Sequence, residues 1–326
     1  MTEATTSELH EPGDRLGSGD TIAFVGTGTM GAPMAGQLMA AEYRLRVHDV
    51  QPAATAALVA SGATAHATAT EAASGADIVL LSLPGPAEVR AAITGAEGVL
   101  AATELPRLII DLSTNAVDVV AELRAICTEA GVVFVDAPVS GGVARASAGT
   151  LAVMVGSEPE EFESARAVLE VIGGDVIHVG PPGTGTVAKI VNNQLFLSAG
   201  ILVQEAYVLG AALGMSPTDL HRIVAASSAA PYAKLAPLLL GRRFDDVIFR
   251  LDIAAKDVGL AIETADAAGV DLPLTRAAGD IYEAAIASGD GELVFHATLR
   301  ELERRAGIEL DPLRRPPRPV ADRDRS

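Results

Sequence analysis

The stretch from Gly183 to Met215 is the feature that most constrains what this chain can fold into. It contains no proline, and its apolar residues recur at helical spacing. This pattern predicts one long and largely buried helix, which ends near Gly214, shortly before Pro217. Because nearly all of this helix is apolar, its few polar residues need an explanation.

Three of those polar side chains lie close together near the start of the helix. Lys189, Asn192 and Asn193 are three and four residues apart, so they share one face. Burying an ammonium and two amides is costly unless they are paired or face a cavity. From these residues alone two interpretations stay open: a lysine that extends to solvent near the helix start, or a functional site.

The part of the chain before this helix has a different pattern. From Thr21 to about Gly180, short runs rich in Val, Ile and Ala alternate with helical patterns, which indicates βαβ units with a parallel sheet. Several runs are apolar on consecutive residues, as in strands that are covered on both faces. The expected strands are TIAFVG from 21, RLRVHD from 44, DIVLLSL from 77, LIIDL from 108, VVFVDAP from 132, LAVMVG from 151 and DVIHVG from 175.

These patterns predict an α/β fold in two parts. A Rossmann-type, doubly wound parallel sheet at 21–182 is followed by an all-α C-terminal domain at 183–307, and the long interdomain helix joins them. We expect the second part to serve the substrate and oligomerisation, with the active site in the cleft between the domains. The tails, 1–20 and 308–326, are polar or rich in proline and arginine, and we expect them to be disordered.

Composition narrows the class of protein. A formal net charge of −18 argues against general nucleic-acid binding, which relies on Lys and Arg to neutralise phosphates. We expect no membrane partner and no secretion, because we find no apolar run of bilayer length and no signal pattern at the N-terminus. The single cysteine, Cys127, fits a reducing cytoplasm and a packing role. No metal-site spacing occurs among the histidines, which are His10, His48, His66, His178, His221 and His296.

A glycine-rich loop, Gly26-Thr27-Gly28-Thr29-Met30-Gly31, joins the first expected strand to a helix. Its first two glycines allow a tight turn close to a pyrophosphate, the third lets helix and strand pack, and the helix N-terminus offers amide N–H groups. Asp49 ends the second expected strand, where its carboxylate would accept both ribose hydroxyls of adenosine. Val50 and Gln51 follow, so no arginine there would bind a 2′-phosphate. We therefore expect NAD, with NADP the weaker alternative.

A second glycine loop, Gly183-Thr184-Gly185, also precedes a helix. It has no acidic residue at the distance that places Asp49 after the first loop. We interpret it as a domain hinge with close backbone packing.

Polar and turn residues follow three expected strands, at the edge where open α/β sheets bind ligands. The turn at 82–89 follows the strand from 77. Ser113 and Thr114 follow LIIDL, where their hydroxyls could bond a nicotinamide ribose and a substrate carboxylate, or instead cap the next helix. Ser140-Gly141-Gly142 would expose backbone N–H groups suited to a carboxylate, although an ordinary loop also explains two glycines.

Five motifs occur in fixed order: GTGTMGAPMAGQL, DLST, DAPVSGG with AGTLAVMVG, GTGTVAKIVNN, and AAKDVGLA. Together they resemble the β-hydroxyacid dehydrogenase family, which includes 3-hydroxyisobutyrate dehydrogenase, tartronate semialdehyde reductase and sugar-acid dehydrogenases. The resemblance covers about residues 21 to 300. It implies reversible, NAD-dependent hydride transfer to or from a small β-hydroxy acid.

The resemblance also implies roles for individual residues. Lys189 would be the catalytic group, a base when the alcohol is oxidised and an acid in the reverse direction. The implied substrate-binding residues are Ser113, Ser140, Gly141, Gly142, Asn192 and Asn193. The implied cofactor-binding residues are Gly26, Gly28, Thr29, Met30, Gly31, Asp49, Leu83, Pro84, Thr114 and Lys256.

Departures from the family leave the substrate open. The 3-hydroxyisobutyrate members resemble SSGxCWS after the long helix, whereas this chain has SSAAPY at 227–232 and no tryptophan. The alternatives are an imine or other semialdehyde reductase of the same superfamily, and an NAD-binding sensor or scaffold without catalysis. Presence of both Lys189 and Asn193 counts against the second. Because one small domain covers a long apolar helix incompletely, we expect a homodimer or homotetramer formed through the helical half.

Overall fold

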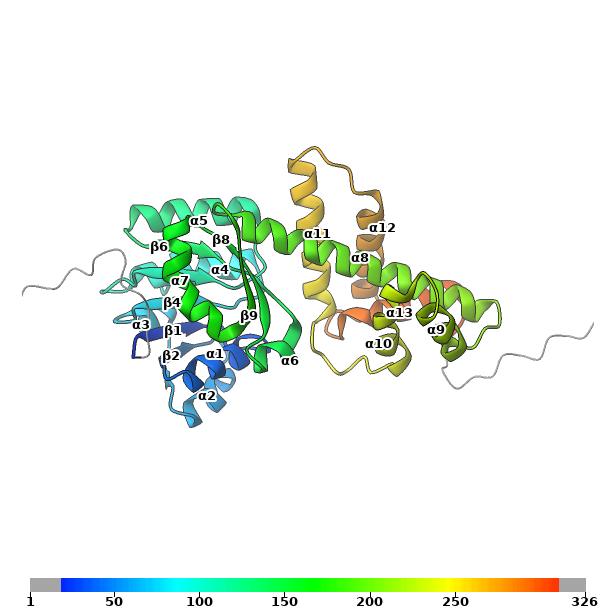
Figure 1. Cartoon of the computed structure of the whole chain (residues 1–326), viewed down its shortest axis with the longest axis horizontal. Helices are drawn as coiled ribbons and strands as arrows, with labels where there is room; N and C mark the ends of the chain where they lie inside the picture. The colour runs from blue at the N-terminus through cyan, green and yellow to red at the C-terminus, as the bar shows by residue number, and fades with distance from the viewer. Residues whose placement is uncertain (1–18, 311–326) are drawn as a thin grey trace, which may run out of the picture. The chain divides into compact units, whose positions relative to one another are not determined.

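The structure is a computed structural model that describes residues 19–310, so most of both expected tails lies outside the described residues. The chain divides into two compact units, the first ending at Lys189 and the second beginning at Ile190. The division falls within one continuous helix, α8 (Thr184–Ala212), which is green in Figure 1.

The first unit is built on a nine-stranded sheet with the order β3-β2-β1-β4-β5-β6-β8-β7, and β9 pairs with β8. The order 3-2-1-4-5-6 is that of doubly wound dinucleotide-binding sheets, which confirms the predicted fold class. The strands are β1 (Thr21–Val25), β2 (Arg44–His48), β3 (Thr64–Ala65), β4 (Ile78–Leu81), β5 (Leu108–Asp111), β6 (Val133–Asp136), β7 (Val139–Ser140), β8 (Leu151–Gly156) and β9 (Gly173–Gly180).

The sheet is parallel from β3 through to β6, as expected, and becomes mixed beyond that strand. Strand β8 runs antiparallel to both β6 and β7, because the chain reverses through a short helix after Ser140. All seven expected strands are present. The two that were not expected, β3 and β7, have only two residues each, too few to leave a periodic pattern.

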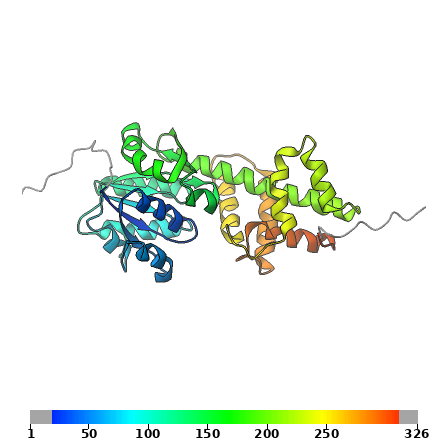
Figure 2. The ribbon, with the colours of Figure 1, turned by 60° about the horizontal axis from the view of Figure 1, so that its bottom comes forward.

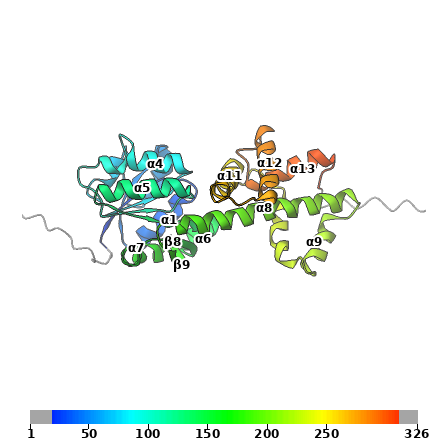
Figure 3. The same cartoon turned by 90° about the horizontal axis from the view of Figure 1, so that it is seen from above.

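Helices cover both faces of this sheet (Figure 3). In β1, Ile22 and Phe24 join one core cluster with the helices at 31–40 and 159–172, while Ala23 and Val25 join another with those at 69–73, 86–94 and 117–129. Burial on both sides explains why these strands are apolar on consecutive residues. The helices are α1 (Gly31–Ala40), α2 (Ala56–Ala60), α3 (Ala69–Ala73), α4 (Pro86–Thr94), α5 (Val117–Glu129), α6 (Gly142–Ser147) and α7 (Pro159–Ile172), with 3-10 turns η1 (Pro52–Thr55) and η2 (Val99–Ala101).

The second unit is helical. Its helices gather along the second half of α8 (Figure 2). From α8, Leu197, Ile201 and Tyr207 enter a common apolar core with these helices. Among the described residues of this unit, β pairing is limited to one bridge between Arg250 and Val294. Its other helices are α9 (Pro217–Ala225), α10 (Ala236–Gly241), α11 (Leu251–Ala267), α12 (Pro273–Ala287) and α13 (Thr298–Ala306), with 3-10 turns η3 (Ala230–Leu235) and η4 (Phe295–Ala297).

Helix α8 ends as the sequence predicts. Gly214 takes a left-handed φ of 86°, and Ser216 caps the next helix, which has Pro217 at its start. One expectation was wrong: α8 is long and apolar enough to cross a membrane by length and composition, although we expected no such run. A core helix meets the same criterion, and 44% of the relevant window is buried inside the molecule.

Candidate active site

The glycine loop between β1 and α1 has the geometry of a dinucleotide cradle. Gly26 has a left-handed φ of 90°, and a Cβ there would collide with the carbonyl oxygen of Ser82. A Cβ at Gly31 would collide with the carbonyl oxygen of Gly26, so the third glycine is needed for helix and strand to pack. A Cβ at Gly28 would meet nothing within 4 Å. Open space therefore lies over the middle of the loop, beside a helix N-terminus without a side-chain cap.

The carboxylate at the end of β2 is tied to this loop. Asp49 Oδ2 accepts the Thr27 backbone N–H at 2.8 Å, and Asp49 Oδ1 accepts the Gln51 N–H at 2.9 Å. The Thr27 hydroxyl also donates to Asp49 Oδ2, at 3.5 Å, whereas Oδ1 can accept a second hydrogen bond, so a ribose hydroxyl can still be bound. Val50, between these residues, is 88% exposed. The residues present thus fit an adenosine dinucleotide.

The ends of β4 and β5 meet through one hydrogen bond. The Leu83 backbone N–H donates to Ser113 Oγ at 2.9 Å, which joins an expected cofactor residue to an expected substrate residue. Buried Asp111 holds this segment by accepting from the Ser113 N–H and from Asn115 Nδ2. Helix α5 begins at Val117 without a side-chain cap, so the alternative interpretation of the serine and threonine as a helix cap is wrong.

The segment Ser140-Gly141-Gly142 exposes its backbone at the end of β7. Gly141 and Gly142 have φ values of 139° and 71°, in the left-handed region that favours glycine. A Cβ at Gly142 would meet nothing within 4 Å, so open space adjoins this backbone. The geometry is compatible with an anion held by successive N–H groups and the Ser140 hydroxyl.

Asp136, at the end of β6, anchors the first turn of α8. Its Oδ1 accepts the Gly183 N–H at 2.7 Å, and its Oδ2 accepts the Thr186 N–H at 2.8 Å. Burial raises the pKa of this carboxyl to about 6, although both N–H groups act in the opposite direction. One side chain therefore fixes the start of the helix that carries Lys189.

The second glycine loop packs closely against the sheet. A Cβ at Gly185 would collide with the carbonyl oxygen of Met154, and one at Gly156 would lie 2.7 Å from the Gly185 nitrogen. The close packing that we expected from this loop is therefore present. Together with Asp136, these glycines set the position of α8 on the first unit.

Lys189 and Asn193 are both buried on α8, one turn apart, whereas Asn192 is exposed. Asn193 Nδ2 donates to Asp257 Oδ2 of α11 at 2.7 Å, and Asn193 Oδ1 accepts from Asn192 Nδ2 at 3.0 Å. A carboxylate only accepts hydrogen bonds, so Asp257 fixes which end of the Asn193 amide faces it. The amide is thereby oriented.

Asp257 is a candidate site residue, through its hydrogen bond to Asn193, that our sequence reasoning did not assign. It is 2% exposed, and the Nζ of Lys256, the expected cofactor residue beside it, lies 2.9 Å from its Oδ1. The available signal was the pairing of these two residues in AAKDVGLA, but its link to Asn193 spans 64 residues of sequence.

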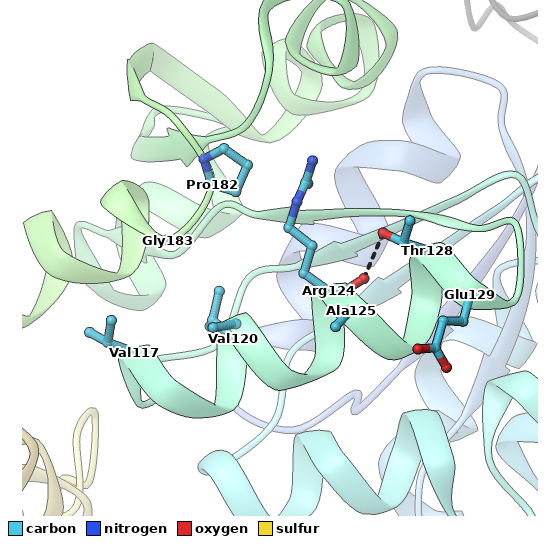
Figure 4. A pocket seen from close by; sticks show the side chains of 9 residues that line it. Val117, Val120, Arg124, Ala125, Thr128, Glu129, Pro182 and Gly183 are labelled. Carbon is cyan, nitrogen blue, oxygen red and sulfur yellow. Dashed lines mark hydrogen bonds between the residues drawn. The ribbon is translucent and has the colours of Figure 1, made fainter.

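The first unit also has an open hollow of about 550 Å³ along α5 (Figure 4). Side chains of Val117, Val120 and Arg124 line it, with Pro182 and Gly183 opposite. None of the expected substrate or cofactor residues lines this hollow. It is separate from the candidate site.

A doubly wound sheet with this glycine loop and acid, followed by a helical unit, defines a dinucleotide-dependent oxidoreductase. Residues 21–180 match the family described as the NAD-binding domain of 6-phosphogluconate dehydrogenase. Residues 183–302 match the family described as "NAD-binding of NADP-dependent 3-hydroxyisobutyrate dehydrogenase". The chain belongs to the β-hydroxyacid dehydrogenase family, as its five motifs predicted.

Individual relatives match along nearly their whole length. The chain is 36% identical to 2-(hydroxymethyl)glutarate dehydrogenase of Eubacterium barkeri, over 89% of this chain and 97% of that protein. It is 38% identical to NAD-dependent L-serine dehydrogenase of Pseudomonas aeruginosa, over 84% and 95% of the two chains. A solved structure of Mycobacterium tuberculosis 3-hydroxyisobutyrate dehydrogenase with L-serine is similar at a TM-score of 0.77 and 36% identity, covering 87% of this chain and 99% of that one.

Proposed function

We propose that this protein oxidises, reversibly and with NAD, a small acid that carries a CH2OH group on the carbon next to its carboxylate. The observation that carries the proposal is the buried pair of Lys189 and Asn193 on one face of α8, with the amide of Asn193 oriented by Asp257. The compounds named for the three relatives, 2-(hydroxymethyl)glutarate, L-serine and 3-hydroxyisobutyrate, share this CH2OH group and differ at the carbon that bears it.

Each polar group then has a task in the reaction. Lys189 Nζ takes the proton of the substrate hydroxyl during oxidation and returns it during reduction. The second N–H of the Asn193 amide donates to the same oxygen and holds it in place. Ser140 and the N–H groups of Gly141 and Gly142 bind the carboxylate. When bound, the nicotinamide supplies the hydride chemistry.

We propose NAD as the preferred cofactor. Asp49 places a negative charge at the end of β2, where it would repel a 2′-phosphate, and exposed Val50 offers that phosphate no cation. The dissociation constants of NADH and NADPH, measured by nicotinamide fluorescence, would test this. Tighter binding of NADPH would refute it.

We propose a homodimer or homotetramer that assembles through α8. Val187, Val191 and Leu195 begin an exposed apolar row along this helix. Its further members, each four or seven residues on from the last, are Leu202, Leu209 and Leu213. Such spacing keeps them on one side of the helix. In a chain whose net charge is −18, an exposed apolar row of this length supports an interface with another copy of the chain. Sedimentation of the wild type should show an oligomer, and Leu202→Glu with Leu209→Glu should shift it toward monomer.

We propose domain boundaries at 21–182 and 183–307, and a cytoplasmic location. The extents of the two family matches support the boundaries.

The single cysteine supports the proposed cytoplasmic location. Cys127 is buried, and burial raises the pKa of its thiol to about 12, which suits a packing role. Fractionation of the source cells would test the location.

Nicotinamide absorbance tests the reaction directly. The purified protein and NAD are mixed with one hydroxy acid per reaction. The compounds are 3-hydroxyisobutyrate, 3-hydroxypropionate, L-serine, glycerate and 2-(hydroxymethyl)glutarate. Reduction of NAD with at least one of them is expected, and Lys189→Ala should abolish it while NADH still binds. Binding of NADH with no turnover of any compound, in either direction, would favour a sensor or scaffold instead.

A further inference from the structure

A buried phenol and the carboxylate that orients Asn193 lie on two helices that pack against each other. Tyr282 on α12 is 0% exposed, and Asp257 on α11 is 2% exposed. The negative charge of Asp257 acts on the Tyr282 phenol and, after burial, is the second cause that raises its pKa. Helices α11 and α12 pack against each other, and Tyr282 lies in the same apolar core as Val258, the residue that follows Asp257.

Both groups carry an atom without a hydrogen bond. Among the described residues, neither the Tyr282 hydroxyl nor Asp257 Oδ1 has a hydrogen-bond partner. Lys256 Nζ lies 2.9 Å from Asp257 Oδ1 and forms an ion pair with it. The two residues are neighbours on one helix, and this contact does not have the geometry of a hydrogen bond. A buried donor and a buried acceptor that stay unpaired on two packed helices are both costly, and each could satisfy the other.

We propose that Tyr282 is a positioning residue for Asn193 that acts through Asp257. In the working enzyme its phenolic O–H donates to Asp257 Oδ1, directly or through one buried water. This inference rests on the proposed function. The bond matters most when Lys256, one quarter of whose side chain is exposed, turns to the cofactor and leaves Oδ1. The phenol then keeps the carboxylate in place, and Asp257 Oδ2 keeps the Asn193 amide aimed at the substrate oxygen.

Tyr282→Phe removes the hydroxyl and little else. We expect kcat for the hydroxy acid to fall about tenfold, because a displaced Asn193 no longer holds the reacting oxygen. The KM for the hydroxy acid and the dissociation constant of NADH should stay within about twofold of wild type. The matched control is Tyr207→Phe, since Tyr207 is an equally buried phenol of the same unit that contacts His221 instead. Its kcat should stay within about twofold of wild type.

A double-mutant cycle tests whether the phenol acts through Asp257. If it does, Tyr282→Phe should cause no further loss of kcat when Asp257→Asn is already present. The shifts in urea midpoint caused by the two single substitutions should likewise not add up in the double variant. An unchanged kcat in Tyr282→Phe, or losses that multiply in the double variant, would overturn the proposal. The urea midpoints test the contact even if no hydroxy acid is turned over, so failure of the proposed function and failure of this inference can be told apart.

Discussion

The buried carboxylate of Asp136 accepts the backbone N–H of Thr186 at 2.8 Å, and so joins the end of a central strand to the first turn of α8. The other oxygen of the same carboxylate holds the Gly183 N–H. Lys189 lies one turn further along the helix. The position of the proposed catalytic amine thus depends on a carboxylate that takes no part in the chemistry.

Asp136→Asn should weaken this anchor. An amide has only one acceptor oxygen, so one of the two N–H groups would face an NH2 group and lose its partner, at a cost of about 1–3 kcal/mol. We expect a lower free energy of unfolding in urea and a lower kcat. The control is Asp175→Asn, an exposed carboxylate of the same unit paired with Arg145. Equal effects of both changes would contradict the anchoring role.

Gly185→Ala should disrupt the packing of α8 on the sheet, because the added methyl would collide with the Met154 carbonyl oxygen. We expect a loss of stability of more than about 1 kcal/mol, since backbone must move. Gly200→Ala on the same helix has nothing within 4 Å of the new methyl, and should be neutral or stabilising by up to about 1 kcal/mol. Urea unfolding of both variants measures the difference. Equal stabilities would mean that the close contact has no energetic role.

Gly28→Ala should separate folding from cofactor binding. The methyl would meet no protein atom within 4 Å, so the free energy of unfolding should stay close to that of wild type. It would instead occupy the space over the loop, and the dissociation constant of NADH should rise about tenfold or more. Gly36→Ala, which also meets nothing within 4 Å, serves as the control in α1 and should bind NADH normally. Unaltered binding in Gly28→Ala would place the pyrophosphate elsewhere.

His296 should make the second unit sensitive to acid. It is 5% exposed, and burial lowers the pKa of its imidazole from 6.5 to about 4. Below pH 6.5 the unfolded chain binds a proton that the folded chain does not, so the free energy of unfolding should fall as the pH drops from about 6.5 to about 4, by up to about 3 kcal/mol. In His296→Phe, which suits the neighbouring Phe244 and Phe295 rings, this slope should be shallower. An identical pH dependence in both proteins would exclude His296 as its cause.

The sequence predicted those parts of the fold that leave a local pattern. Strands that are covered on both faces, such as β1, have continuous apolar residues, and the long helix α8 has periodic ones. The glycines at which a side chain would collide with backbone are recognisable from their spacing in the glycine-rich loops. Asp257 left no such pattern, because its partner Asn193 belongs to another helix. The spacing of Lys189, Asn192 and Asn193 predicted one shared face, but neighbouring residues on a helix point about 100° apart, and only Asn193 of the two amides is buried.

The composition of α8 alone does not show where its polar residues lie. By length and composition α8 could cross a membrane, yet its buried side carries Lys189, Asn193 and Gln204, and the last two form hydrogen bonds with Asp257 and Thr298 of other helices. A count of apolar residues does not record which side of a helix the polar ones occupy.

Continuity of α8 sets a limit on how this enzyme can change. Every residue added to or removed from a helix turns all that follows by about 100° and shifts it by about 1.5 Å. One residue inserted between Lys189 and Asn193 would leave both the Asp136 anchor and the Asn193–Asp257 hydrogen bond in place, but would turn Lys189 off the helix face that it shares with Asn193. Surface loops can lengthen or shorten without such a rotation, whereas the segment of α8 between Lys189 and Asn193 can vary only by substitution.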